Sequence, residues 1–242
     1  MAKTFTISDE AILRRIRKML DLKVEYLKHI NDIHVELKPG NTKTGTKCWT
    51  TSLIPIVDCI NCSGCKNNCY DIRNDCIYPS VLDSRAKNSA IHSADPDRYW
   101  KEVGDEITNK NAEQLRINVG GDLRYVDFNL IKDLGEDKSG CDMLFFTKNY
   151  DECNQYISEN ITKYPDNYGF PSNVHPIYSR WIGMECNNPY GVPESHVLWE
   201  DGRTTAPEFG AYYCGGNCSE CHFNKEGCWV LKKNESVIFK AH

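Results

Sequence analysis

Cysteines carry most of the chemistry that this sequence could perform, because the chain has thirteen and four of them fall within eleven residues. Those four are Cys59, Cys62, Cys65 and Cys69, spaced C-x2-C-x2-C-x3-C. Gaps of two residues let a loop turn back on itself, so that successive sulfurs converge on one metal ion or one corner of an iron–sulfur cube. Four neighbouring thiolates repel one another unless a cation gathers them. The spacing predicts a metal site, with iron–sulfur as the leading interpretation and zinc as the alternative.

A second cluster stands near the end of the chain. Cys214, Cys218 and Cys221 are spaced C-x3-C-x2-C, and Cys228 follows seven positions later. The triad resembles that of radical S-adenosylmethionine enzymes, whose three thiolates leave one iron of a 4Fe–4S cluster open to the cofactor. The resemblance implies S-adenosylmethionine as a candidate cofactor. If Cys228 is instead a fourth ligand, the site is closed, and closed metal sites are structural rather than catalytic.

A glycine turn gives a second link to the same enzymes. Residues 115–119 are predicted to form a strand, which Gly120, Gly121 and Asp122 close. The turn resembles the Gly-Gly-Glu turn that meets the cofactor's amino group in those enzymes, and this makes the three residues candidates for cofactor binding. The alternative is an ordinary tight turn between a strand and a helix, with Asp122 as the helix N-cap.

Together these pieces resemble the phage gene product 88 family, which is found in phage and prophage genomes. The resemblance covers roughly residues 45–242 and depends on six short matches: Cys65-x3-Cys69-Tyr70, Gly121-Asp122, Phe146-Thr147-Lys148, Cys228-Trp229, Val237-Ile238-Phe239 and His242. It implies a phage-encoded protein in the host cytoplasm, and it implies no particular reaction. It also implies that the two cysteine clusters belong to one metal region and lie close in space.

Strands and helices alternate between these motifs. Helices are predicted from Ser8, from the N-cap and proline pair Asp95-Pro96, and over residues 127–134 and 151–159. Strands are predicted over residues 115–119, 143–147, 178–182, 197–199 and 236–239. This order indicates an α/β fold with parallel βαβ units. We expect a partial, radical-SAM-like βα barrel or an open sheet, with cysteine-rich metal-binding loops at both ends.

The first helix is predicted to be an addition to this fold. Leu13, Ile16, Leu20, Val24 and Leu27 form one apolar stripe at steps of three and four residues. Basic residues on the opposite face are interleaved with acidic ones, which is typical of a solvated surface. We therefore expect an N-terminal amphipathic helix extension in residues 1–34 and a single α/β metal-binding domain in residues 35–242.

Composition excludes several classes of protein. A formal net charge of −5 argues against coating nucleic acid by bulk electrostatics. The first residues contain no apolar signal segment, and no run of about 18 apolar residues could cross a membrane. We therefore expect a reducing cytoplasm, in which clustered thiols are metal ligands rather than disulfides. The other cysteines are predicted to be small buried hydrophobes: Cys48, Cys76, Cys141, Cys153 and Cys186.

Two functions stay open at this point. The first is a phage-type iron–sulfur protein on a radical-SAM-like scaffold, with one or two 4Fe–4S clusters and a structural or electron-carrying role favoured over catalysis. The second is a zinc-stabilised binding module that acts on nucleic acid or a host protein without catalysis, since two closed zinc sites would use the same eight cysteines. No catalytic residue is predicted under either interpretation.

Overall fold

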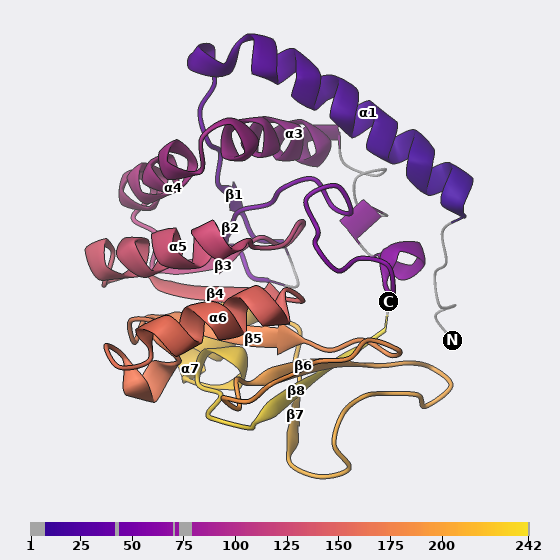
Figure 1. Cartoon of the computed structure of the whole chain (residues 1–242), viewed down its shortest axis with the longest axis vertical. Coiled ribbons are helices and arrows are strands. Elements are labelled where there is room, and N and C mark those ends of the chain that lie inside the picture. The colour runs from indigo at the N-terminus through magenta and orange to yellow at the C-terminus, as the bar shows by residue number, and fades with distance from the viewer. Residues whose placement is uncertain (1–7, 42–43, 70, 73–78, 242) are drawn as a thin grey trace.

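The computed structural model describes residues 8–41, 44–69, 71–72 and 79–241, and its strands form one sheet (Figure 1). The strands are β1 (Lys38–Pro39), β2 (Trp49–Thr50), β3 (Gln114–Ile117), β4 (Asp142–Thr147), β5 (Val174–Ser179), β6 (Glu194–Leu198), β7 (Ala211–Tyr213) and β8 (Ser236–Lys240). The α-helices are α1 (Asp9–Lys28), α3 (Pro79–Ala94), α4 (Pro96–Lys110), α5 (Tyr125–Asp137), α6 (Tyr150–Asn160) and α7 (Cys218–Asn224). Short 3-10 helices are η1 (Ile30–Asp32), η2 (Lys66–Asn68), η3 (Pro165–Asn167) and η4 (Gly227–Trp229).

The spatial order of the strands is β1-β2-β3-β4-β5-β6-β8-β7, and each pair is parallel except β1 with β2. From β2 through β6 to β8, neighbours in the sheet follow chain order, as right-handed βα crossovers favour. In register, Arg116 of β3 lies opposite Leu144 of β4. The expected α/β fold is confirmed as an open sheet, mostly parallel and not closed into a barrel. Its likeness to the radical-SAM scaffold stays a prediction.

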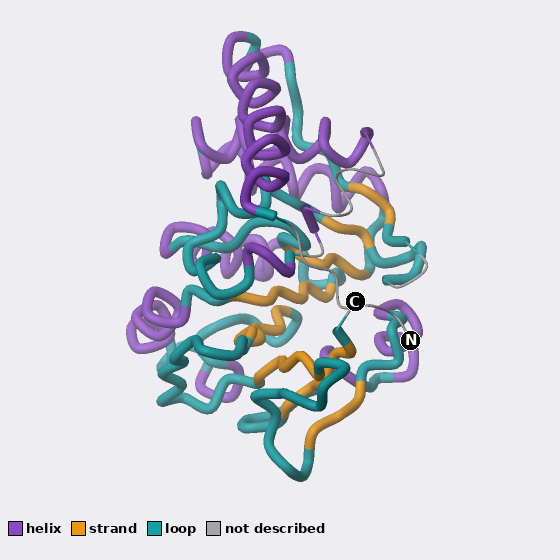
Figure 2. The backbone as a smooth tube through the Cα atoms, turned by 90° about the vertical axis from the view of Figure 1, so that its right-hand side faces the viewer, coloured by secondary structure: helices purple, strands orange, loops and turns teal. Residues whose placement is uncertain are grey.

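The two faces of the sheet are covered differently. Met143 and Phe145 of β4 point to the face on which α4, α5 and α6 pack, and the main core contains Phe128, Tyr156 and Phe170 there. Leu144 points to the opposite face, where a smaller core forms around Cys48, Ile177, Cys221 and Trp229. Figure 2 shows the strands between helices on one side and mostly loops on the other. Side-chain alternation along β4 therefore separates a helix-covered core from a cysteine-rich one.

Local signals account for the helix starts. Asp95 accepts a hydrogen bond from the Arg98 backbone N–H at 2.9 Å, with Pro96 at the first helical position, as predicted for α4. Ser8 accepts from the Ala11 N–H at 3.3 Å and caps α1. No helix in the described ranges is both long and apolar enough to cross a membrane.

Helix α1 packs along α3 with a face that differs from the predicted stripe. Ile12 and Met19 are buried with Ile54 and Ile72, whereas much of the stripe lies on the outer surface. Leu13 is 60% exposed, Leu20 38%, Val24 53% and Leu27 39%. The apolar arc of α1 is wider than one contact face, so spacing alone could not say which part α3 covers. The division at residue 34 stays a prediction.

Candidate metal centres

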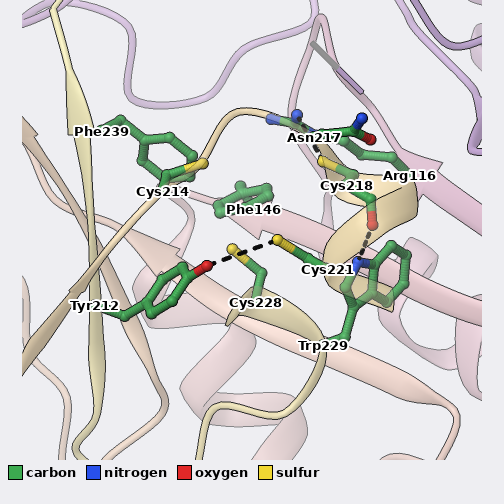
Figure 3. Close-up of a pocket in the computed structure, with 10 residues that line it drawn as sticks. All are labelled: Arg116, Phe146, Tyr212, Cys214, Asn217, Cys218, Cys221, Cys228, Trp229 and Phe239. Carbon is green, nitrogen blue, oxygen red and sulfur yellow. Dashed lines mark hydrogen bonds between the residues drawn. The ribbon is translucent and has the colours of Figure 1, made fainter. Parts of the chain in front are cut away.

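The four C-terminal cysteines come together at one cavity (Figure 3). Cys214 follows β7, Cys218 and Cys221 lie on α7, and Cys228 lies in η4. The three-residue step places Cys218 and Cys221 on one side of the helix, which Asn217 caps by accepting from the Glu220 N–H at 3.2 Å. All four side chains point into the same space. The cavity has a volume of about 10 Å³, room for about one water-sized atom.

Aromatic side chains wall this C-terminal site. The rings of Phe146 and Phe239 are 5.9 Å apart, and the Tyr212 hydroxyl lies 3.8 Å from the Cys221 sulfur. Trp229 donates from Nε1 to the Cys218 carbonyl at 2.9 Å, which fixes η4 against α7. Burial raises the pKa of the Cys228 thiol, and the neighbouring sulfurs raise it further. Binding of a metal by Cys228 therefore requires that the metal displace the thiol proton, because a cysteine ligand is a thiolate.

The first cluster occupies the loop after β2, at the carboxyl ends of β3 and β4. Asn61 donates from Nδ2 to the Lys148 carbonyl at 2.7 Å, which ties the loop to the end of β4. The Ile56 N–H lies 3.3 Å from the Cys59 sulfur, and such N–H groups stabilise thiolates in metal sites. Burial raises the pKa of Cys69 to about 12, and Asp71 adds to the rise. All four cysteines of this N-terminal site are half-buried, as are three of the four at the C-terminal site.

Neither site has coordinating geometry in this structure. Among the described residues, no group of three or more Cys, His, Asp or Glu side chains could hold a metal ion as placed. The donor set of each site does fit a metal. Each site has four thiols, and in each site a backbone N–H group lies within hydrogen-bond distance of a cysteine sulfur. The assignment of the eight cysteines as ligands therefore stays a prediction.

The glycine turn lies beside the N-terminal site. From the sequence it was linked to the C-terminal triad instead, because both resemble parts of radical S-adenosylmethionine enzymes. Gly120 accepts at its carbonyl from the Leu53 N–H at 2.8 Å, and the Asp122 N–H donates to the Asp58 carbonyl at 3.0 Å. A Cβ on Gly120 would lie 2.0 Å from Asp71 Oδ2. A Cβ on Gly121, which has a φ of +85°, would lie 2.8 Å from the Leu53 Cβ. Glycine is required at both positions because the segments flanking the cysteine loop pack directly on the turn.

The Asp122 carboxylate serves the chain itself. Its Oδ1 accepts from the Leu123 N–H at 2.8 Å and the Thr147 hydroxyl at 2.7 Å, and its Oδ2 accepts from the Lys148 N–H at 2.9 Å. Burial raises its pKa, and these donors oppose that rise. Asp122 is not a helix N-cap: α5 begins at Tyr125 with Arg124 as its cap residue, and Asp127 supplies the capping carboxylate. Through the hydrogen bonds of Asp122, the turn ties the carboxyl end of β3 to the carboxyl end of β4.

Several residues outside the predicted set belong to these sites. Cys48 is fully buried in the core that contains Cys218 and Cys221, a contact its spacing could not reveal. His222, next to Cys221 on α7, has its Nε2 2.6 Å from Asp142 Oδ2. Cys141 and Cys153 are buried as predicted, Cys186 is half-buried, and Cys76 lies outside the described residues.

Comparison with known proteins supplies the family. No curated protein and no solved structure matches the chain, and the radical-SAM resemblance finds no support there. The family model described as Gene product 88 matches residues 26–183, which is well over half of the chain. The match starts earlier than predicted and ends before the second cluster, so it contains the N-terminal site and the glycine turn. The chain belongs to the Gene product 88 family.

Proposed function

We propose that this chain is an iron–sulfur protein whose two four-cysteine sites hold metal, in a structural or electron-carrying role. The observation that carries the proposal is the convergence of Cys214, Cys218, Cys221 and Cys228 on one cavity. Inert thiols pack singly, like other small hydrophobes, so packing alone does not explain why four thiols from β7, α7 and η4 converge. An iron–sulfur cluster supplies one-electron transfer when bound.

The N-terminal site is the better candidate for exchange with other molecules. Its loop lies at the carboxyl ends of β3 and β4, the edge at which ligands of α/β sheets collect. Its C-x2-C-x2-C-x3-C spacing is that of bacterial ferredoxins, which favours an iron–sulfur cluster. The residues of the chain would hold this cluster, shield it from water and donate N–H groups to its sulfur ligands.

A role for S-adenosylmethionine is less well supported. In its favour, the cysteine loop and the Gly120-Gly121-Asp122 turn are neighbours at the carboxyl edge of adjacent parallel strands. Against it, both Asp122 oxygens already accept hydrogen bonds, and Leu53 and Asp71 fill the space over the glycines. An electron-carrying or structural site needs no free carboxylate at the turn. The observed turn therefore agrees better with such a site than with S-adenosylmethionine binding.

Zinc at the C-terminal site is the second candidate, and the ligand set favours it. Four thiolates are the complete ligand set of a closed tetrahedral zinc site, and four cysteines line this cavity. With zinc in both sites, the chain would be a binding module stabilised by metal.

Anaerobic purification with metal and sulfide analysis tests the proposal. We expect a brown protein with broad visible absorption, and iron that is lost from one site in a Cys59→Ser, Cys65→Ser variant and from the other in a Cys218→Ser, Cys228→Ser variant. A colourless protein with zinc in both sites would establish the binding module instead. Titration of the reduced protein with S-adenosylmethionine, followed by electron paramagnetic resonance, then tests the cofactor: an unshifted signal excludes it.

A further inference from the structure

Helix α1 is the outermost helix of the molecule and lies across α3 (Figure 1). Of its 20 residues only Ile12 and Met19 are buried, and they belong to a small core that is separate from the main one. Its Tyr26 hydroxyl donates to Asp83 of α3. The family match begins at residue 26, so most of α1 lies outside the matched part of the chain. A helix with so few buried side chains can open while the main core stays folded.

The same helix holds the segments on both sides of the N-terminal cysteines. Before the cysteines, Lys23 Nζ lies 3.5 Å from Asp58 Oδ1, and the two side chains are only 12% and 5% exposed. After the cysteines, Arg15 donates from Nη1 to the Ile72 carbonyl at 3.2 Å. Because these two partners stand at the two ends of the cysteine loop, α1 fixes where the loop leaves the core and where it returns.

Contacts within the loop complete this hold. Asn67 donates from Nδ2 to Asp9 Oδ1 at 2.9 Å, and Lys66 Nζ lies 3.5 Å from the same oxygen. Both residues belong to η2, between the third and fourth cysteines. The fourth, Cys69, packs against the small core that α1 shares with the loop. Helix α1 thus contacts the loop before, between and after its cysteines, and none of these contacts reaches the C-terminal site.

We propose that α1 is a strap that controls access to the N-terminal cysteine loop. While α1 lies on α3, it limits the entry of thiol reagents and metal ions, and its release from α3 opens the loop to them. The strap acts on one cysteine site alone, because its contacts lie on that loop and its two flanks. The inference goes beyond the proposed function, since it concerns access to the thiols whether or not they hold metal.

Hydrogen exchange and thiol alkylation of the full-length protein as purified, both resolved by mass spectrometry, test the strap. Three substitutions loosen α1 at different places. Lys23→Gln and Arg15→Gln each remove one polar contact, and Met19→Ala leaves a cavity in the small core. Each is expected to speed exchange of the α1 amides and alkylation of the N-terminal cysteines together, by about tenfold or more. Alkylation of Cys186 and the C-terminal cysteines should keep its wild-type rate.

Arg14→Gln and Lys18→Gln, at exposed positions of the same helix, are the matched controls and should change neither rate. Equal acceleration of alkylation at both cysteine sites would show a general loss of stability and overturn the strap. Faster alkylation without faster exchange of the α1 amides would also overturn it, because the loop would then open without the helix. So would faster exchange of α1 with alkylation unchanged. Metal analysis of the same samples tests the proposed function separately, so each idea can fail without the other.

Discussion

The rings of Phe146 on β4 and Phe239 on β8 are in edge-to-face contact, with centroids 5.9 Å apart, although β5 and β6 lie between their strands. In a flat sheet, strands three places apart are separated by about 14 Å. The contact therefore requires the sheet to curl strongly across β4 to β8. Curling gives the cysteine-rich face a concave shape, and the C-terminal site lies within that concavity.

Loss of this contact should weaken the curl. Phe239→Leu keeps an apolar side chain but removes the ring pair, so we expect a loss of about 1 kcal/mol in the free energy of unfolding, measured in urea. We also expect faster release of metal from the C-terminal site. Phe223→Leu is the matched control, because Phe223 is 85% exposed and its loss should change neither quantity. Equal effects of the two substitutions would contradict the role given to Phe239.

Metal at the C-terminal site should stabilise the fold. Closed thiolate sites contribute on the order of 10 kcal/mol to folding in zinc peptides, so Cys228→Ser or a strong chelator should lower the melting temperature markedly. Cys186→Ser, at a half-buried cysteine outside both clusters, should leave the metal content unchanged. A stripped protein that melts at the same temperature as the loaded one would refute this prediction.

Asp122 is expected to act on stability. Asp122→Asn replaces a charged acceptor of three hydrogen bonds, so we predict a loss of about 1–3 kcal/mol in the free energy of unfolding. Asp201→Asn, at an exposed aspartate, should change stability by less than about 0.5 kcal/mol. If Asp122→Asn is as stable as the wild type, the carboxylate does not have the structural role given to it here. That result would favour binding of S-adenosylmethionine at the turn.

A second buried carboxylate fastens α3, α4 and α5 together. Asp127 is fully buried, and its Oδ1 lies 2.7 Å from both His92 Nε2 and Trp100 Nε1. Removing the charge from such a network costs about 3–5 kcal/mol, so Asp127→Asn should be among the most destabilising single changes. Chemical denaturation measures this, with the exposed Asp133→Asn as the control. A loss below about 1 kcal/mol would count against a shared carboxylate.

Alkaline pH should destabilise the protein through its buried thiols. Burial raises the pKa of Cys153 from an ordinary 9.0 to about 12. Below pH 9 the thiol is protonated whether the chain is folded or not; between pH 9 and 12 only the unfolded chain loses the proton. Stability should therefore fall in that window, by up to about 1.4 kcal/mol per pH unit for this thiol. Urea denaturation at pH 8 and pH 10, with reductant, should show a shallower fall for Cys153→Ala; parallel curves would be contrary evidence.

Local signals in the sequence predicted some elements well. The pair Asp95-Pro96 marks the start of α4 because an N-cap and a fixed proline φ act within one turn. Cysteine spacing likewise predicts that Cys218 and Cys221 share one short segment, and they do, although that segment is the helix α7 and not the predicted loop. Both cases depend on residues no more than a few positions apart.

Contacts between distant segments explain what was missed. Helix α3 buries Asn88 and Ser89, whose partners Glu36 and Asp58 lie far away in the sequence, so it shows no simple apolar stripe. The glycine turn lies beside the N-terminal site because β2 and β3 are neighbours, and β2 has only two residues. A strand of two residues shows almost no hydrophobic periodicity, so β2 could not be recognised in the sequence. Without β2, the position of the turn could not be predicted.

Arg116 Nη1 lies 3.9 Å from the Cys218 sulfur, and the 102-residue separation between the two residues has a consequence for synthesis. A ribosome makes the chain from the amino end, so the concave face of β3 and β4 is complete long before α7 and β8 exist to cover it. Until then that face presents Leu144 and Phe146 to the solvent or to a chaperone. The C-terminal site can close only after α7 and β8 have been made, and until then that uncovered surface distinguishes a partly made chain from the folded one.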